Sequence, residues 1–155
     1  MNIEEKVTRA REYFLKGHAC SQAVAAAFHE EMGLTEEEVF TLTLGFGGGF
    51  GGMREVCGCV SGMTMVLSRL YATDGLNHGQ KKELYETVRR AAEMFTAEFG
   101  TIGCRQLLIS AGETVKAEPR ERTPAYYRER PCVRYVEYAA QITAQILQEK
   151  ENGQR

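Results

Sequence analysis

The helical spacing of apolar residues is the feature that most constrains how this chain can fold. Ile3, Val7, Ala10 and Phe14 recur every three or four residues, and similar stripes return up to about residue 148. This spacing places apolar side chains on one face of an α-helix. No run alternates between apolar and polar residues for long enough to predict a strand. The sequence therefore predicts an all-α protein.

Capping signals and glycines set the predicted helix boundaries. Thr35, followed by three glutamates, predicts a capping box, and Gly17, Gly33 and Gly100 suit the ends of helices. Residues 111–130 hold two prolines and many charges, which predicts a long irregular connection. The predicted helices span residues 3–17, 20–32, 35–44, 54–71, 80–99, 104–109 and 131–148.

Length and composition predict one compact multi-helix domain. The 155 residues are 43% apolar, which is enough for a single hydrophobic core. We expect residues 1–150 to form this domain, 151–155 to form a frayed tail, and Asp74-Gly75 to close the helix that ends near residue 71. A net charge of -2 provides no field that would attract nucleic acid or an anionic membrane.

The chain is expected to be cytoplasmic. Its first six residues are acidic and polar, unlike a secretory signal, and the low-charge stretch 56–68 is too short to cross a bilayer. In a reducing cytosol, five cysteines favour metal binding or redox chemistry over structural disulfides. Free cysteine can also serve as a small core side chain.

Four of the five cysteines fall within the first turn of a predicted helix. They are Cys20, Cys57, Cys104 and Cys132. A helix N-terminus favours negative charge, so these thiols should ionise easily, and they are the candidate catalytic and metal-ligating residues. Cys59 lies two residues after Cys57 and would point to the opposite side of a helix, unless the backbone at Cys57 is not yet helical. We expect it to fill the core.

The spacing of the cysteines excludes several familiar sites. There is no Cys-x-x-Cys pair, which argues against the usual zinc finger, thioredoxin and bacterial ferredoxin motifs. There is no Cys-x-x-Cys-His, which argues against covalent haem. Any site must therefore be assembled by tertiary structure.

Six glycines between residues 45 and 52 predict a loop with a specific purpose. The stretch formally matches a dinucleotide-binding fingerprint, but no alternating strands and helices surround it. We expect its bare backbone to approach the cysteines and to aim amide hydrogens at sulfur or at an anionic substrate. A flexible hinge between helices is the alternative. The candidate cofactor-binding glycines are Gly47, Gly48, Gly49, Gly51 and Gly52.

Two further groups of residues are weaker candidates. His18 lies two residues before Cys20 and is near enough in sequence to reach the same site, although an exposed loop histidine is more common. The arginines between residues 120 and 134, with Tyr126 and Tyr127, have the chemistry to receive an anion or a partner. A solvated charged loop is the favoured interpretation of this stretch.

Four segments surround the cysteines: Ala19–Val24, Gly47–Gly52 with Cys57–Gly62, Gly103–Leu108, and Cys132–Val136 with Ala139-Ala140. They resemble the C_GCAxxG_C_C family of putative redox-active proteins. This resemblance implies an α-helical domain whose cysteines are redox-active or hold an iron–sulfur cluster, related to a domain of the dimeric split-Soret cytochromes. The haem-binding segment of those cytochromes is missing here, and Cys59 stands where the family carries small residues such as alanine.

Three functional hypotheses follow. The first is a redox protein in which the four cysteines bind an iron–sulfur or other metal centre and exchange electrons with a donor or acceptor not identified by the sequence. The second is a thiol–disulfide oxidoreductase that uses one cysteine pair. The third is a structural zinc or helical interaction module, dimeric through the region of Met53, Met63 and Met65.

Overall fold

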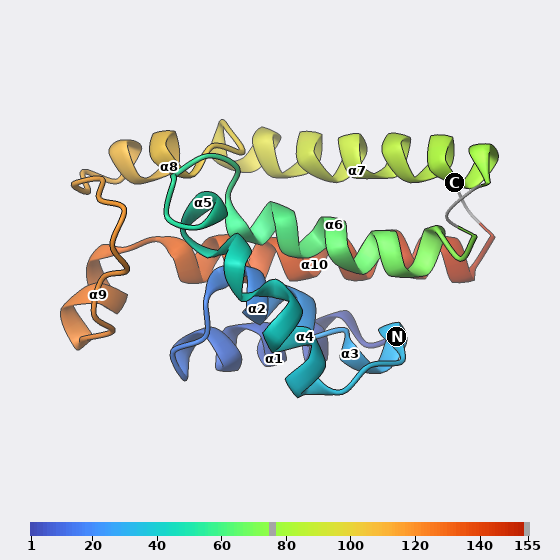
Figure 1. The fold of residues 1–155 in the computed structure, drawn as a ribbon, viewed down its shortest axis with the longest axis horizontal. Helices are drawn as coiled ribbons and strands as arrows, with labels where there is room; N and C mark the ends of the chain where they lie inside the picture. Colours follow the sequence, from blue (N-terminus) through green and yellow to red (C-terminus); the bar gives the residue numbers. More distant parts are fainter. Residues whose placement is uncertain (75–76, 154–155) are drawn as a thin grey trace.

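A computed structural model describes residues 1–74 and 77–153, and within these ranges the chain is helical without any strand (Figure 1). One isolated bridge joins Val56 to Gly103. The all-α prediction is confirmed. The elements are α1 (Ile3–Leu15), α2 (Cys20–Ala26), α3 (His29–Met32), α4 (Glu36–Thr43), the 3-10 turn η1 (Leu44–Phe46), α5 (Gly47–Phe50), α6 (Gly58–Tyr71), α7 (His78–Phe99), α8 (Cys104–Ser110), α9 (Pro124–Glu129) and α10 (Cys132–Glu151).

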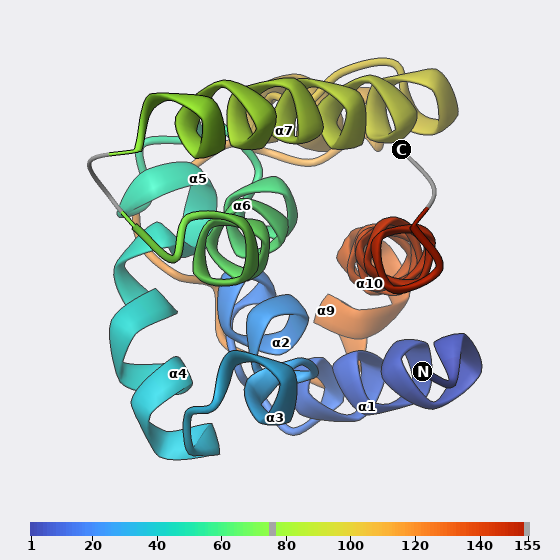
Figure 2. The same ribbon diagram turned by 90° about the vertical axis from the view of Figure 1, so that its right-hand side faces the viewer.

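The long helices α6, α7 and α10 run along the longest axis of the molecule, and the short helix α2 packs beneath them (Figures 1 and 2). Helix α2 contacts α1, α4, α6 and α10, and α1 lies against α10. Small residues from Ala23 to Ala27 make this close approach possible, because they are fully buried without needing much space.

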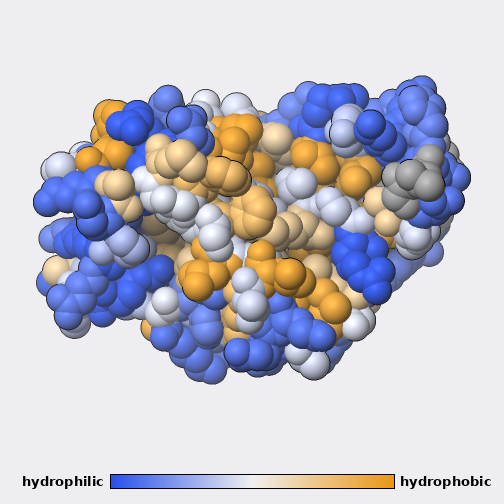
Figure 3. Space-filling model, viewed as in Figure 1, coloured by the Kyte–Doolittle hydropathy of each residue, from blue (hydrophilic) through white to orange (hydrophobic). Residues whose placement is uncertain are grey.

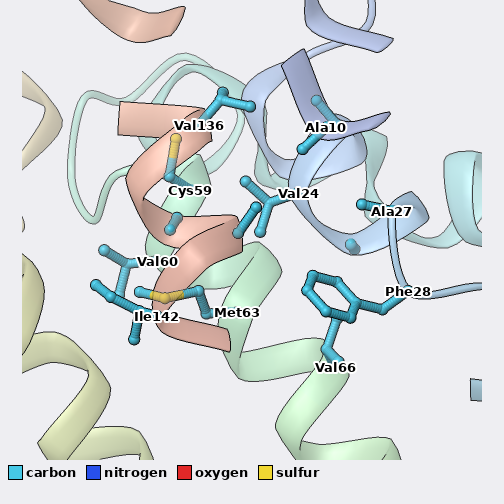
Figure 4. Packing of buried hydrophobic residues seen from close by; sticks show 14 of the residues in the cluster. Ala10, Val24, Ala27, Phe28, Cys59, Val60, Met63, Val66, Val136 and Ile142 are labelled. Carbon is cyan, nitrogen blue, oxygen red and sulfur yellow. The ribbon is translucent and has the colours of Figure 1, made fainter. Parts of the chain in front are cut away.

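The hydrophobic core lies where α2, α6 and α10 meet (Figure 4). Phe28, Met63 and Ile142 are among its largest fully buried side chains. Burying side chains of this size contributes about 1.5–3 kcal/mol each. The core thereby fixes the three helices whose first residues carry Cys20, Cys57 and Cys132.

Local capping signals predicted most helix boundaries correctly. The Thr35 hydroxyl accepts a hydrogen bond from the Glu38 amide, and the Glu38 carboxylate accepts one from the Thr35 amide at 2.8 Å. Gly17, Gly33 and Gly100 all have positive φ at the ends of helices. These positions satisfy backbone groups that the helix itself leaves unpaired.

Two predicted helices differ from the structure. The helix predicted over residues 20–32 is broken at Ala27 and Phe28 into α2 and α3. The helix predicted from residue 54 begins only at Gly58, because Arg54 has a φ of 59° and the following residues run beside Gly103. Tertiary contacts override the helical pattern at this point.

The C-terminal third is more helical than predicted. The connection predicted over residues 111–130 contains α9, which Thr123 caps, and α10 continues to Glu151 instead of fraying after Gln148. The predicted roles of Gly75 and of residues 154–155 lie outside the described residues. The single-domain prediction stays a prediction.

The surface carries apolar groups but no membrane-spanning helix. In the described ranges, no helix is both long enough and apolar enough to cross a membrane. Figure 3 shows apolar side chains gathered in the middle of one face. Met53 is half exposed, whereas Met63 is buried in the core and cannot contribute to the dimer contact considered above. The large apolar residues that are most exposed are Leu15, Leu42, Leu44, Phe50, Met53, Val56, Tyr85 and Ile109.

Candidate functional site

All five cysteines line one cavity of about 490 Å³. Four of them stand at helix starts, as predicted. Cys20 is the first residue of α2, Cys104 of α8 and Cys132 of α10, and Cys57 is the N-cap of α6. Helices α6 and α10 both begin in the half of the molecule that carries α8 and α9 (Figure 1). The structure thus brings together four cysteines that are far apart in the sequence.

A short extended pairing joins the starts of α6 and α8. The Cys57 amide donates to the Ile102 carbonyl at 2.8 Å, and the Cys104 amide donates to the Glu55 carbonyl at 2.6 Å. These bonds flank the bridge between Val56 and Gly103. Two cysteines that stand 47 positions apart in the chain are thereby fixed beside each other by backbone alone.

Cys59 belongs to the cavity as well as to the core, which corrects its expected role as filler alone. Cys57 has φ -52° and ψ 132°, so the backbone there is not helical, and both thiols face the same side. Cys59 is fully buried and hydrogen bonded to Cys20 and Cys57. It also packs among the core residues of α6 (Figure 4). The predicted helix start at residue 54 lies too early, and it therefore turned Cys59 away from Cys57.

Cys20 is the thiol best able to ionise. Hydrogen bonds from Cys57 and Cys59, a backbone bond from Ser21 and the charge of Arg122 hold the pKa of Cys20 well below its ordinary value, against the effect of burial. The hydrogen bond with Cys20 raises the pKa of Cys57, because that thiol must keep its proton to donate it. Of this trio, Cys20 is the sulfur whose negative form the other two thiols stabilise.

The expectation that all four helix-start thiols ionise easily is wrong for three of them. The pKa of Cys57 is raised by its bond to Cys20, and burial raises the pKa of Cys104 despite the nearby Arg54. Burial also raises the pKa of Cys132 to about 12. Removal from water therefore outweighs the favourable position at a helix N-terminus.

The glycine stretch forms a left-handed turn. Gly48, Gly49, Phe50, Gly51 and Gly52 all have positive φ, between 59° and 80°. Successive L-residues with side chains cost about 1–2 kcal/mol each in this conformation, and glycine avoids that cost. Hydrogen bonds close the turn, including one of 2.8 Å from the Glu55 amide to the Gly49 carbonyl.

Two glycines allow backbone to approach the cysteines closely. A Cβ placed on Gly49 would lie 2.6 Å from the Cβ of Cys104, and a Cβ placed on Gly58 would lie 2.5 Å from the Cys20 sulfur. The expected close approach is therefore present, with Gly58 as an additional contributor. The amides of Gly51 and Gly52 bond to carbonyls within the turn, so they are not directed at sulfur.

Four arginines also line this cavity. Three of them belong to the segment between residues 120 and 134, so the prediction of a solvated charged loop is wrong for those three. Among the described residues that line the cavity there is no aspartate or glutamate. Arg54 was not predicted as a site residue, although it follows the glycine turn directly and is separated from it by Met53 alone. Arg128 and Arg134 are exposed, as expected for a solvated segment. The lining arginines are Arg54, Arg120, Arg122 and Arg130.

The remaining candidate, His18, packs against an aromatic ring rather than against a cysteine in the contacts that the described residues show. Its ring stacks on Phe40 with 3.9 Å between centroids and 8° between planes. His18 is not among the described residues that line the cysteine cavity. His18 is half-buried instead of fully exposed.

No ready-made metal site is present in the part of the chain that the structure describes. Groups of three or more His, Cys, Asp or Glu side chains arranged to hold a metal ion are absent there. Cys20, Cys57 and Cys59 are in hydrogen-bond contact, and all five cysteines line the same space. Their arrangement has room for a group larger than a single ion.

A redox class of protein agrees with this helical fold and its cysteine-lined cavity. The sequence model of the family described as "Putative redox-active protein (C_GCAxxG_C_C)" matches residues 18–146. The chain belongs to this family, and the resemblance noted from its sequence is confirmed. No curated protein and no solved structure matches the chain.

Proposed function

We propose that the chain is an electron-transfer protein whose centre, an iron–sulfur cluster or a comparable metal group, is held by Cys20, Cys57, Cys104 and Cys132. The observation that supports it is the single cavity lined by cysteines from the starts of four helices. Thiolate is the usual ligand of iron–sulfur clusters, which supply one-electron chemistry. Family membership supports the redox character, and the metal is our proposal.

The arrangement suits a polynuclear cluster better than a single zinc ion. Four sulfurs around one zinc lie about 2.3 Å from the metal and therefore about 3.8 Å from each other. No group of three candidate ligands in the described residues already meets the requirements of a metal site. Ligands placed around a cavity of about 490 Å³ fit a group that contributes several atoms of its own.

The chain itself would orient the ligands and exclude water. Gly49 lets the turn close against Cys104, and Gly58 leaves room for the Cys20 sulfur. Leu107, Leu108 and Tyr135 are buried and line the same cavity. Second-sphere packing of this kind controls solvent access and hence the reduction potential of a bound centre.

A thiol–disulfide function is the second candidate, favoured by the contact among Cys20, Cys57 and Cys59. The lowered pKa of Cys20 makes it the nucleophile of the trio, with a thiol partner already in hydrogen-bond contact. Oxidation of two such thiols forms one S–S bond and gives two electrons and two protons to an acceptor. This function would need no metal.

Anaerobic purification separates the two candidates. We expect brown protein with iron and acid-labile sulfide, a visible absorption band that bleaches on reduction, and loss of both after Cys104→Ser. Colourless, metal-free protein with a rapidly alkylated Cys20 would instead establish the thiol–disulfide function. Zinc without any redox-active species would overturn both in favour of a structural module.

A further inference from the structure

Two of the arginines at the cavity carry a positive charge that no carboxylate neutralises. Arg120 pairs with Glu113 and Glu129, and Arg130 pairs with Glu113 at 3.3 Å. For Arg54 and Arg122, the described residues provide no carboxylate within ion-pair distance. The positive charge of the cavity therefore comes mainly from Arg54 and Arg122.

Arg122 is held firmly by neutral groups. Its guanidinium carbon lies 4.5 Å from the Phe14 ring centre and 4.6 Å from that of Tyr126. It donates a hydrogen bond of 3.1 Å to the His18 carbonyl. Its charge also acts on the sulfur of Cys20. Aromatic faces and a carbonyl orient the group but leave its full charge in place.

Arg54 is fixed just as firmly and lines the same cavity. It is only 6% exposed. Its Nε donates to the Lys116 carbonyl at 2.8 Å, and its Nη1 donates to the Cys104 sulfur at 3.7 Å. Arg54 also adopts a left-handed φ of 59°, which is costly for a residue with a side chain. The fold thus accepts backbone strain in order to place a buried cation beside a sulfur.

Guanidinium charges that no carboxylate neutralises favour the entry of negative charge into the cavity beside them. We propose that Arg54 and Arg122 form an anion-binding site in the cysteine cavity for a compact group with two negative charges. In metal-free protein this group is a free oxyanion. In protein that holds the proposed metal centre, the group is that thiolate-bound centre. Only this second part of the proposal rests on the function proposed above.

Sulfate binding tests whether the metal-free protein holds a free oxyanion at Arg54 and Arg122. Reduced, metal-free protein is titrated with sodium sulfate against sodium chloride at equal ionic strength, by calorimetry and by thermal unfolding. Sulfate should bind the parent protein and raise its unfolding midpoint more than chloride does. Arg122→Gln should weaken sulfate binding at least about tenfold, whereas Arg128→Gln, an exposed arginine on α9, should change it less than about twofold.

A second arginine keeps the test decisive if one variant folds poorly. Arg54→Gln should weaken sulfate binding as Arg122→Gln does, and Arg54→Lys, which keeps the charge, should recover part of it. Sulfate that acts no more strongly than chloride would overturn the proposal. Equal sulfate binding by the parent protein and Arg122→Gln would overturn it as well.

Protein that holds a reconstituted metal centre tests separately whether the centre occupies the anion site. If the centre occupies the same anion site, protein reconstituted with iron and sulfide should bind sulfate at least about tenfold more weakly than metal-free protein. Unchanged sulfate affinity after loading would show that the two groups do not share a site. If no centre can be reconstituted, the function proposed above fails, while the result for the metal-free protein still decides the anion site.

Discussion

Replacing Gly49 by alanine tests whether the glycine turn exists to bring backbone against Cys104. Gly49 has a φ of 68°, and an added Cβ would lie 2.6 Å from the Cys104 Cβ, 2.7 Å from the Arg54 Cα and 2.8 Å from the Glu55 amide nitrogen. Two of these three atoms belong to backbone, so they cannot move aside as a flexible side chain would. The turn would have to shift.

The neighbouring glycine provides a matched control. Gly48 has nearly the same φ, 64°, but a Cβ there would meet only the end of the Arg54 side chain, at 3.6 Å. Gly48→Ala should therefore show the left-handed strain alone, about 1 kcal/mol. Gly49→Ala should add an overpacking cost of about 1–3 kcal/mol, for a total of about 2–4 kcal/mol.

Urea unfolding of the reduced, metal-free protein measures the difference. The midpoint should fall in the order parent, Gly48→Ala, Gly49→Ala, with unchanged dependence on urea concentration. In thermal unfolding, each kcal/mol should lower the midpoint by about 2–4 °C for a chain of this length. Gly100→Ala has positive φ in open space and controls for strain far from the cysteines. Agreement between Gly48→Ala and Gly49→Ala to within about 0.5 kcal/mol would refute the close-approach argument.

Three further outcomes are expected. The unfolding free energy of reduced, metal-free protein should fall as pH rises from 9 toward 12, because the unfolded chain loses the Cys132 proton before the folded chain does. The slope from this thiol is about 1.4 kcal/mol per pH unit, and an equal slope in Cys132→Ala would contradict the assignment. Cys59→Ala should keep the iron content of anaerobically purified protein, and loss of iron would make Cys59 a ligand. Thr35→Ala should cost about 1 kcal/mol in urea unfolding through loss of the helix cap, and no measurable cost would show that the cap contributes nothing.

Helix caps and helix starts that depend on a few neighbouring residues were predictable from the sequence. Thr35 and Glu38 form the capping box that their spacing indicated, and Gly100 ends α7 as a left-handed cap. The helix-start positions of Cys104 and Cys132 followed from Gly103 and Pro131, which disfavour continuation of a helix before them. These signals act within one turn, so no knowledge of the tertiary fold is needed to recognise them.

Features that depend on distant segments were not predictable. The start of α6 moved to Gly58 because residues near 56 pair with a segment near 103, and no local pattern announces that pairing. The same shift turns Cys59 toward the cavity. Arg122 reaches the site by stacking on Phe14, which is more than one hundred residues away in the chain. The many charged residues around Arg122 predicted a solvated loop for this segment.

The thiols show why a helix start is not sufficient for reactivity. Cys132 opens the 20-residue helix α10, yet burial raises its pKa to about 12, whereas Cys20 opens a helix of only 7 residues and has a lowered pKa. The difference lies in the hydrogen bonds that Cys20 accepts from Cys57, Cys59 and the Ser21 backbone, since the charge of Arg122 acts on both thiols. In the metal-free protein, the raised pKa values of Cys57, Cys104 and Cys132 favour their neutral, protonated forms, which do not balance the charge of the arginines. A metal that displaced those protons would turn the same sulfurs into anionic ligands, and the positive charge of the cavity would then be matched.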